Sequence, residues 1–241
     1  ADFVERTVLD LIALGADDVQ LDLQFDKSRL MARHVAGRYM DGDLSGKGIF
    51  AIAGLPELSG ELSLNNIDLS AFLDATSGVD DVHGRLNVQA NFNAVGISPY
   101  DLMTNLSGRG LLRVTDGVAA WWAGDTPPQP EQEEPETGIA DIENADENGV
   151  QETSAFSLSG EFKLNEGVLK PETAFELTVG GRTGTSVGHI HLPKWQVEIE
   201  HRLNRKDGGQ YQEDETPTRL VDRITIVGNI SRPEIQYNNQ P

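Results

Sequence analysis

The chain of 241 residues contains no cysteine, and this absence removes several kinds of chemistry at once. A protein without thiols forms no disulfide, no thiolate metal site and no cysteine nucleophile. The redox compartment stays open, because an oxidising space permits disulfides without requiring them. The chain also lacks any stretch near the roughly 18 apolar residues typical of a membrane-spanning helix, and its N-terminus lacks a signal-peptide pattern. Because Ala1 begins in mid-pattern, we expect a fragment of a longer protein whose anchor lies outside it.

Basic residues are scarce: 19 Lys and Arg stand against 39 Asp and Glu, giving a formal net charge of -20. This charge argues against a nucleic-acid partner, whose affinity would depend on neutralising phosphates. Half of the imbalance is local, because residues 125–152 contain ten acidic residues and no Lys or Arg. Four prolines fall in the same segment. It cannot bury enough apolar surface to offset the entropy of ordering it, so we expect a disordered acidic insert.

Most of the chain alternates apolar and polar residues with a period of two, which is typical of half-exposed strands. Val19, Leu21, Leu23 and Phe25 give the most regular example. The alternation returns after residue 153 and continues to the last strand-like segment near Ile226. Because turn-type residues separate these segments, the pattern predicts an antiparallel meander. In the first part of the chain, breaks are expected at Asp41-Gly42, Gly46, Gly48, residues 54–56 and Asn65-Asn66.

Residues 85–118 predict a strand, a capped helix and a second strand. Ser98 supplies an N-cap hydroxyl, Pro99 suits the first helical position, and Asp101 places negative charge in the first turn. We expect Asp116-Gly117 to close the second strand with a turn. One side of this helix carries Leu102, Met103 and Leu106. If these three residues cover Leu86, Val88 and Phe92, the helix seals this end of the sheet. Two further short helices are expected, over residues 2–14 and 68–73.

A faint internal repeat predicts that similar hairpins stack along one direction. Residues 59–66, SGELSLNN, share a frame with residues 159–166, SGEFKLNE. Units that bury their apolar faces only against neighbours build elongated assemblies. The sequence therefore predicts a mainly β fold: an elongated, twisted, groove-like antiparallel sheet of hairpins with a few short amphipathic helices. Three regions are expected: an N-terminal helix with the first part of the sheet (1–124), the acidic insert (125–152) and the second part of the same sheet (153–241).

Motifs that would carry chemistry are incomplete wherever they occur. His189 and His191 would face the same side of a strand, which is half of a metal site, but no carboxylate lies near them in sequence. Residues 41–46 resemble the start of a calcium loop, yet Ile52 stands where a bidentate Glu is required. The glycines of residues 180–188 lack the ending of a phosphate loop, so we expect a Gly-rich hairpin there. We therefore expect no catalytic residue, no metal ligand and no cofactor.

The apolar strand faces are the remaining candidate site. They would either line a lipid-carrying groove or form the core beneath the helices, and for the middle strands we favour the core. Burying one such side chain stabilises a protein by roughly 1.5 to 3 kcal/mol, so leaving many exposed without a ligand would be costly. The adjacent tryptophans are expected at a sheet edge. The residues expected to face lipid or a partner are Leu21, Leu23, Phe25, Trp121, Trp122, Phe175, Leu177 and Trp195.

Five segments in order resemble the C-terminal region of the AsmA family. They are GRLNVQANFNAVG, the short helix SPYDLMTNLSG, GLLRVTDGV, FSLSGEFKLNEGVL and the closing ITIVGNISRPEI. The resemblance extends over roughly residues 19–235, and its motifs are structural. It implies a bacterial cell-envelope protein, anchored in the inner membrane by a missing N-terminal helix, with a periplasmic β-rich body of the kind shared with TamB-like proteins. It also implies a role in outer-membrane biogenesis and, as in the larger family members, phospholipid transport along an apolar groove.

Three classes of function are therefore weighed. The first is a non-catalytic envelope protein that holds or transfers phospholipid acyl chains, with envelope proteins as further partners. The second is an acidic β-rich module for protein binding or adhesion, without a lipid role, whose apolar face docks a partner. The third is an enzyme, such as a glycan-acting domain with paired carboxylates, which the family resemblance disfavours because AsmA proteins are not enzymes. The sequence favours the first class.

Overall fold

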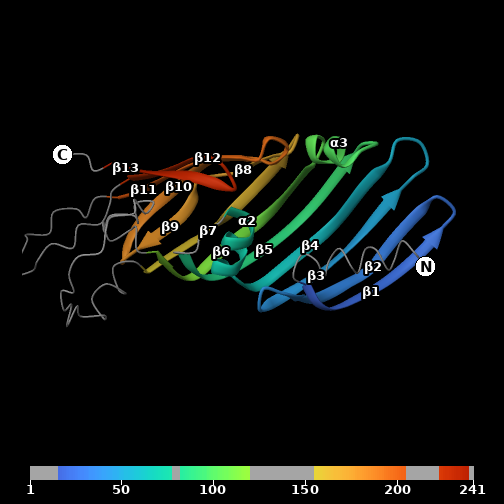
Figure 1. Cartoon of the computed structure of the whole chain (residues 1–241), viewed down its shortest axis with the longest axis horizontal. Helices are drawn as coiled ribbons and strands as arrows, with labels where there is room; N and C mark the ends of the chain where they lie inside the picture. The colour runs from blue at the N-terminus through green and yellow to red at the C-terminus, as the bar shows by residue number, and fades with distance from the viewer. Residues whose placement is uncertain (1–15, 78–81, 120–154, 205–222, 239–241) are drawn as a thin grey trace, which may run out of the picture.

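The computed structural model describes residues 16–77, 82–119, 155–204 and 223–238, and these form one antiparallel sheet of 13 strands (Figure 1). The first strands are β1 (Ala16–Asp26), β2 (Arg29–Tyr39), β3 (Gly42–Ala51), β4 (Glu57–Asp68), β5 (Val82–Val95) and β6 (Ser107–Ala119). They are followed by β7 (Ala155–Asn165), β8 (Val168–Pro171), β9 (Phe175–Val179), β10 (Arg182–His191), β11 (Gln196–Leu203), β12 (Arg223–Asn229) and β13 (Arg232–Asn238). The helical elements are α2 (Leu69–Ser77), α3 (Pro99–Thr104) and the 3-10 helix η2 (Leu192–Lys194).

The strands pair in nearly sequential order, which confirms the predicted antiparallel sheet of hairpins. Only β8 and β9 depart from this order, because both lie between β7 and β10. They act as one interrupted strand with a break at residues 172–174. β6 pairs with β7, so strands on the two sides of residues 120–154 belong to the same sheet. The expected helix at 2–14 and the expected insert at 125–152 lie outside the described residues.

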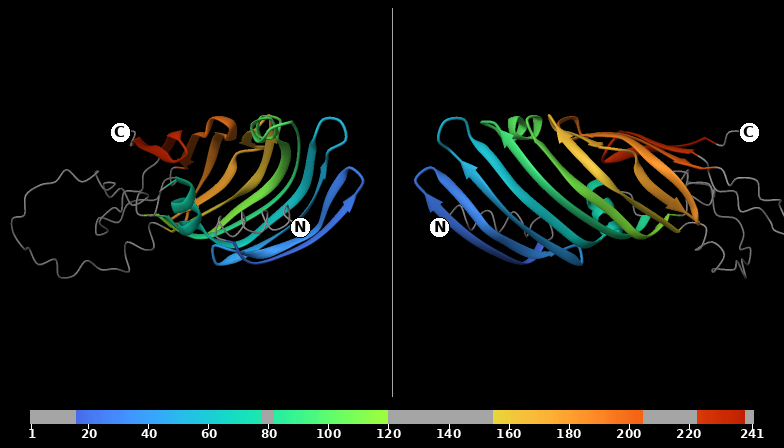
Figure 2. Two further views of the ribbon diagram at one scale, coloured as in Figure 1. Left: turned by 45° about the vertical axis from the view of Figure 1, so that its right-hand side comes forward. Right: turned by 180° about the vertical axis from the view of Figure 1, so that it is seen from behind.

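The hairpin connections gather at two opposite ends of the strands. One end, which we call the loop rim, carries the β1–β2, β3–β4, β7–β8 and β12–β13 connections together with α3 and η2 (Figure 1). The other end, the α2 rim, carries α2, the β2–β3 and β9–β10 turns, and the points where residues 120–154 and 205–222 join the sheet. Figure 2 shows that the sheet is strongly twisted and that α2 lies against one of its faces.

Several residues expected to form turns lie within strands instead. β4 continues through Asn65-Asn66 and β6 continues through Asp116-Gly117, and in both strands the pairing register shifts there. Asn66 and Asp116 have φ of 56° and 52°, so each adds one left-handed residue and makes a bulge rather than a reversal. The expectation of turns at these two places was wrong because Asn and Asp tolerate this conformation in bulges as well as in turns.

Other turns differ in detail from the prediction. The β2–β3 turn is formed by Met40-Asp41, one residue earlier than predicted, and both residues have positive φ. Gly42 already belongs to β3, where an added Cβ would lie 2.5 Å from the Asn65 carbonyl oxygen. Gly46 and Gly48 lie inside β3 and do not interrupt it. The predicted Gly-rich hairpin near residue 180 is present, with Gly180 and Gly181 between β9 and β10.

The two α-helices have different roles. Ser98 and Asp101 form the predicted cap of α3, since Ser98 Oγ accepts from the Asp101 amide at 3.1 Å and Asp101 Oδ2 accepts from the Ser98 amide at 3.1 Å. However, α3 lies at the loop rim and buries none of its residues, so it does not seal the middle of β5. The helix that packs on β5 and β4 is α2, which is longer than the single turn predicted for residues 68–73.

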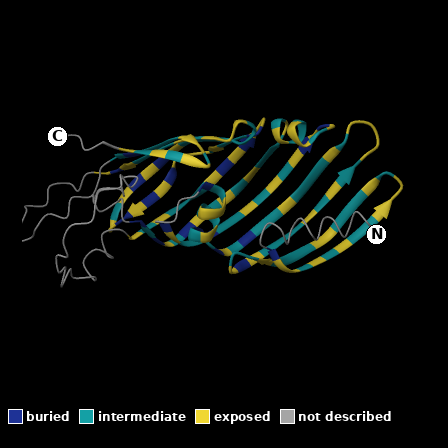
Figure 3. Ribbon diagram, in the orientation of Figure 1, coloured by how far each residue is buried: buried dark blue, intermediate teal, exposed yellow. Residues whose placement is uncertain are grey.

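The core lies beneath and beside α2, on one face of β4–β7 and β9–β12. Ile67, Leu177, Val179 and Ile224 are the largest hydrophobic side chains fully buried there, and Leu69 of α2 joins the same cluster. Burial decreases from this region toward β1–β3, as Figure 3 shows. The sheet therefore has a sealed part around α2 and an open part at its N-terminal strands.

Candidate functional site

The strand register places apolar residues in continuous rows across the sheet, on the face that α2 partly covers. We call this the apolar face. One row runs through Leu30, Phe50, Leu58 and Ala94 on β2–β5, and begins at Phe25 on β1. A parallel row farther from the loop rim runs through Leu44, Leu64, Val88 and Leu112 on β3–β6. Each row is perpendicular to the strands and so follows the long direction of the sheet.

Between these two rows, glycine and alanine recur on the same strands, and we call these residues the glycine band: Gly46, Gly48, Gly60, Ala90, Gly108 and Gly110. Two larger side chains interrupt the band, because Leu62 pairs with Gly46 on β4 and Phe92 pairs with Gly60 on β5. On β1 and β2 the band continues into Leu21, Leu23, Ala32 and Val35, which are only partly buried. Only the Ser59 carbonyl oxygen at 3.1 Å and Gly60 Cα at 3.8 Å lie within 4 Å of a Cβ built at Gly48. Among the described residues, no side chain therefore packs over Gly48.

Phenylalanine rings lie across four glycines of neighbouring strands. The pairs are Phe92 with Gly60, Phe162 with Gly110, Phe156 with Gly117 and Phe175 with Gly160, and the first three are also partners in the strand register. The ring carbons are close enough that a Cβ built on any of these glycines would lie less than 3 Å from the nearest one. Such pairs compensate for the missing glycine side chain by packing the ring on its backbone. Gly60 and Gly160 are the shared glycines of the internal repeat, so this packing explains the repeat.

The structure places the predicted site residues in three different settings. Leu21 and Leu23 are partly buried and Phe25 is exposed, and all three lie on the apolar face at the open end of the sheet. Phe175 and Leu177 lie on β9 and are buried, so they belong to the interior and offer no accessible surface. Trp195 stands apart at the loop rim, where its indole N–H donates to Ser231 Oγ at 2.8 Å. Trp121 and Trp122 lie outside the described residues.

Several residues of the uncovered surface were not predicted from the sequence. Leu30, Phe50 and Leu58 continue the surface of Leu21 and Leu23 over β2, β3 and β4. Their strands contain glycines that look like breaks in the sequence, which obscured the period-two pattern. The useful signal is the spacing Gly46-x-Gly48-x-Phe50, since residues two apart in a strand share a face.

The opposite face of the sheet is polar and has a different character. An open hollow of about 720 Å³ lies there over β2–β7. Its lining includes Arg33, Lys47, Glu61, Arg109 and Glu161, and Lys47 Nζ lies 3.0 Å from Glu61 Oε2. Both partners of this ion pair are more than half exposed, and such pairs contribute little to stability. The mixed charges of this hollow select no particular ligand.

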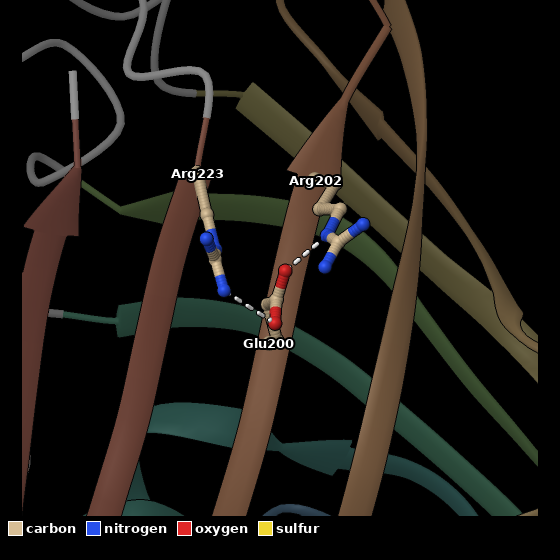
Figure 4. A network of polar contacts seen from close by, with 3 residues as sticks. All are labelled: Glu200, Arg202 and Arg223. Carbon is tan, nitrogen blue, oxygen red and sulfur yellow. Dashed lines mark hydrogen bonds and ion pairs between the residues drawn. The ribbon is translucent and has the colours of Figure 1, made fainter. Parts of the chain in front are cut away.

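Three charged residues connect β11 with β12 on the polar face (Figure 4). Glu200 accepts a hydrogen bond from Arg202 Nε through Oε1, and Arg223 Nη2 donates to its Oε2 at 2.9 Å. The hydrogen bond from Arg202 is the largest cause of a lowered pKa of Glu200; the bond from Arg223 acts in the same direction, against partial desolvation. The carboxylate therefore stays ionised at neutral pH and holds the ends of β11 and β12 together.

On the apolar side of β11, His201 lies between Ser186 and Ile224 of the neighbouring strands. Burial lowers the pKa of His201 to about 4. The imidazole is therefore neutral at pH 7 and is compatible with an apolar surrounding. His189 and His191 lie together on β10, as predicted, and the described residues hold no group of three His, Asp or Glu side chains placed to bind a metal ion.

Comparisons of the chain with protein-family models, curated proteins and solved structures find no match. Within the described ranges, no helix is both long and apolar enough to cross a membrane. The function of the chain is therefore inferred from the geometry of the two faces of the sheet.

Proposed function

We propose that the chain is the β-rich body of a non-catalytic cell-envelope protein of the AsmA type, and that its apolar face holds phospholipid acyl chains. The observation that carries the proposal is the continuous apolar surface of β2–β6, on which the small residues of the glycine band lie between rows of mostly larger side chains and are interrupted by Leu62 and Phe92. A saturated hydrocarbon chain is long, narrow and without polar groups, and its contact with such a band needs no hydrogen bonds. The band also runs in the direction in which a chain would have to lie to meet many strands.

The partial exposure of apolar side chains on β1–β4 supports this role. Leu23, Leu30, Phe50 and Leu58 are all accessible to a ligand to some degree, and Phe25 is 67% exposed. A fully exposed side chain of this size gains roughly 1.5 to 3 kcal/mol when it is removed from water, and a partly buried one gains less, so a hydrophobic ligand would stabilise this end of the sheet. The sealed region around α2 supplies the rigid part on which these open strands are built.

In the family that the sequence resembles, the equivalent body is periplasmic and anchored in the inner membrane, and its role supports outer-membrane biogenesis. We propose the same location and role here, with phospholipid as the ligand and envelope proteins as partners. The alternative is a protein-binding module that uses the same apolar face for a partner and has no affinity for lipid.

The proposal is tested by adding one charge to either face of β3. Gly48→Glu places a carboxylate on the glycine band, where the structure leaves space for a side chain. Ile49→Glu makes the same change one residue later, on the polar face, at a side chain that is 41% exposed. The folded chain is incubated with phosphatidylethanolamine vesicles, separated from them and analysed by native mass spectrometry. Circular dichroism confirms that both variants are folded.

We expect the unchanged chain and Ile49→Glu to carry phospholipid and Gly48→Glu to lose most of it, because a buried carboxylate disfavours contact with hydrocarbon. Equal lipid occupancy in the two variants would contradict the assignment to the apolar face. An unchanged chain that takes up no lipid but binds an envelope protein through this face would favour the alternative.

A further inference from the structure

Exposed apolar side chains are concentrated at the loop rim. Ile97 is 78% exposed, Leu55 68% and Tyr100 65%, and Phe25, Ile52, Val95, Met103 and Trp195 are also exposed at this end of the strands. Among the described residues, only three exposed large apolar side chains lie elsewhere, namely Ile49, Leu111 and Val187 on the polar face. Single exposed hydrophobic residues are ordinary, but a concentration along one edge indicates a surface that contacts something apolar.

The connections of the loop rim are joined to one another by backbone hydrogen bonds. The Ile52 amide donates to the Ser28 carbonyl at 2.8 Å, and the Gly96 amide donates to the Pro56 carbonyl at 2.9 Å. Farther along the rim, the Gly167 amide donates to Leu106, the Leu192 amide donates to Gly167, and the Ile230 amide donates to Trp195. The rim is therefore an ordered edge whose main-chain groups are partly satisfied within the chain, which favours contact with a medium that offers few hydrogen bonds.

Charges near the loop rim are nearly balanced. The basic residues there include Lys27, Arg29, Lys194 and Arg232, and the acidic ones include Asp26, Glu57, Asp101 and Glu166. The described residues therefore give this edge little net charge, which favours neither an anionic nor a cationic surface.

We infer that the loop rim is a membrane-contact edge, whose apolar tips enter the interfacial region of a lipid bilayer. A bilayer suits the linear arrangement of the tips, because a flat surface contacts several hairpins at once. It also suits their composition, since Tyr100 and Trp195 combine an apolar ring with a polar group, as side chains at membrane interfaces do. The near balance of charge makes apolar insertion the main contribution. This edge acts independently of acyl-chain binding on the apolar face.

The test is flotation of the chain with vesicles of phosphatidylcholine alone, at low and at high salt. We expect binding that changes little with salt, because the contact is mainly apolar. In a Leu55→Glu and Ile97→Glu double variant the partition coefficient should fall about a hundredfold, or roughly tenfold for each side chain lost from the bilayer. Leu111→Glu, at a side chain that is 50% exposed on the polar face, is the matched control and should bind like the unchanged chain.

A second measurement avoids charged substitutions and uses the absence of cysteine. Ile97→Cys and Leu111→Cys are each labelled with a fluorophore that shifts to the blue in an apolar medium. We expect a shift at position 97 and none at position 111 when vesicles are added. Failure of the unchanged chain to float, equal loss in both glutamate variants, or a shift at position 111 alone would overturn the inference. Binding only to anionic vesicles that high salt abolishes would also overturn it. The Gly48→Glu variant should float with vesicles like the unchanged chain. Flotation therefore tests the membrane-contact edge separately from the acyl-chain binding proposed for the apolar face.

Discussion

Replacing Gly160 by Ala tests the packing of phenylalanine rings on glycines, which builds the sealed part of the sheet. A Cβ at this position would overlap Phe175 Cδ1 and would lie 3.2 Å from Phe175 Cα. Phe175 is buried, so its ring cannot turn toward solvent without losing its packing. Forcing an extra carbon into a packed interior costs about 1 to 3 kcal/mol. We expect Gly160→Ala to lower the free energy of unfolding by about 2 kcal/mol.

The coupling between the two residues is the sharper prediction. Phe175→Val removes the ring carbons nearest to Gly160 and keeps a residue that suits a strand. Its own cost includes the lost buried surface, but Gly160→Ala should then be nearly neutral in the Phe175→Val background. A double-mutant cycle should give an interaction energy of about 1 to 2 kcal/mol. Equilibrium urea unfolding, followed by circular dichroism, measures all four proteins.

Gly48→Ala is the matched control for this cycle, because only two backbone atoms lie within 4 Å of its added Cβ and none is closer than 3.1 Å. We expect its effect to stay within about 0.5 kcal/mol, since Ala loses less conformational entropy on folding than Gly. If Gly160→Ala costs the same with and without the Phe175 ring, the packing argument is refuted.

Two further predictions concern pH and the helix at the loop rim. The pKa of His201 is lowered to about 4 in the folded chain, below its ordinary value near 6.5, so the folded chain binds fewer protons between these values. The stability that neutral His201 contributes is therefore fully present above about pH 6.5 and is lost toward pH 4, by at most about 3 kcal/mol. His201→Gln should flatten this part of the curve of unfolding free energy against pH. An unchanged curve would contradict the burial of the imidazole. Ser98→Ala removes the N-cap of α3 and should cost about 1 kcal/mol in urea unfolding. The control Thr104→Ala removes a side-chain bond to the Tyr100 carbonyl and should cost less; equal costs would show that the cap has no special role.

The fold was largely predictable because strand periodicity is a strong local signal. Val19 to Leu23 and Ala90 to Ala94 alternate in burial as the sequence predicts, whereas Phe25 is 67% exposed at the end of its strand. The errors came from residues that have two structural meanings. Asn66 and Asp116 look like turn residues, but the cross-strand pairing on both sides of them makes them bulges. The sequence also gives no indication that α2 instead of α3 covers β5, because this depends on where each connection enters the sheet.

The candidate site was only partly predictable, because it is a property of several strands together. Leu21 and Leu23 were found from the pattern of one strand, and they lie on the accessible part of the apolar face. Phe175 and Leu177 have the same local pattern, yet they are buried by neighbours distant in sequence. The glycine band appears only when the register aligns Gly48 with Gly60, which no single segment contains. Side-chain exposure thus depended on long-range contacts that periodicity does not encode.

The central claim, that the apolar face holds acyl chains, is tested most directly by a phospholipid that carries a photoactivatable group within its acyl chain. After irradiation of the complex and digestion, mass spectrometry identifies the crosslinked residues. We expect crosslinks at Leu23, Leu30, Phe50 and Leu58, which lie partly exposed on the apolar face of β1–β4. Crosslinks confined to the polar face, at Ile49 or Leu111, would contradict it, as would the absence of any crosslink to the sheet.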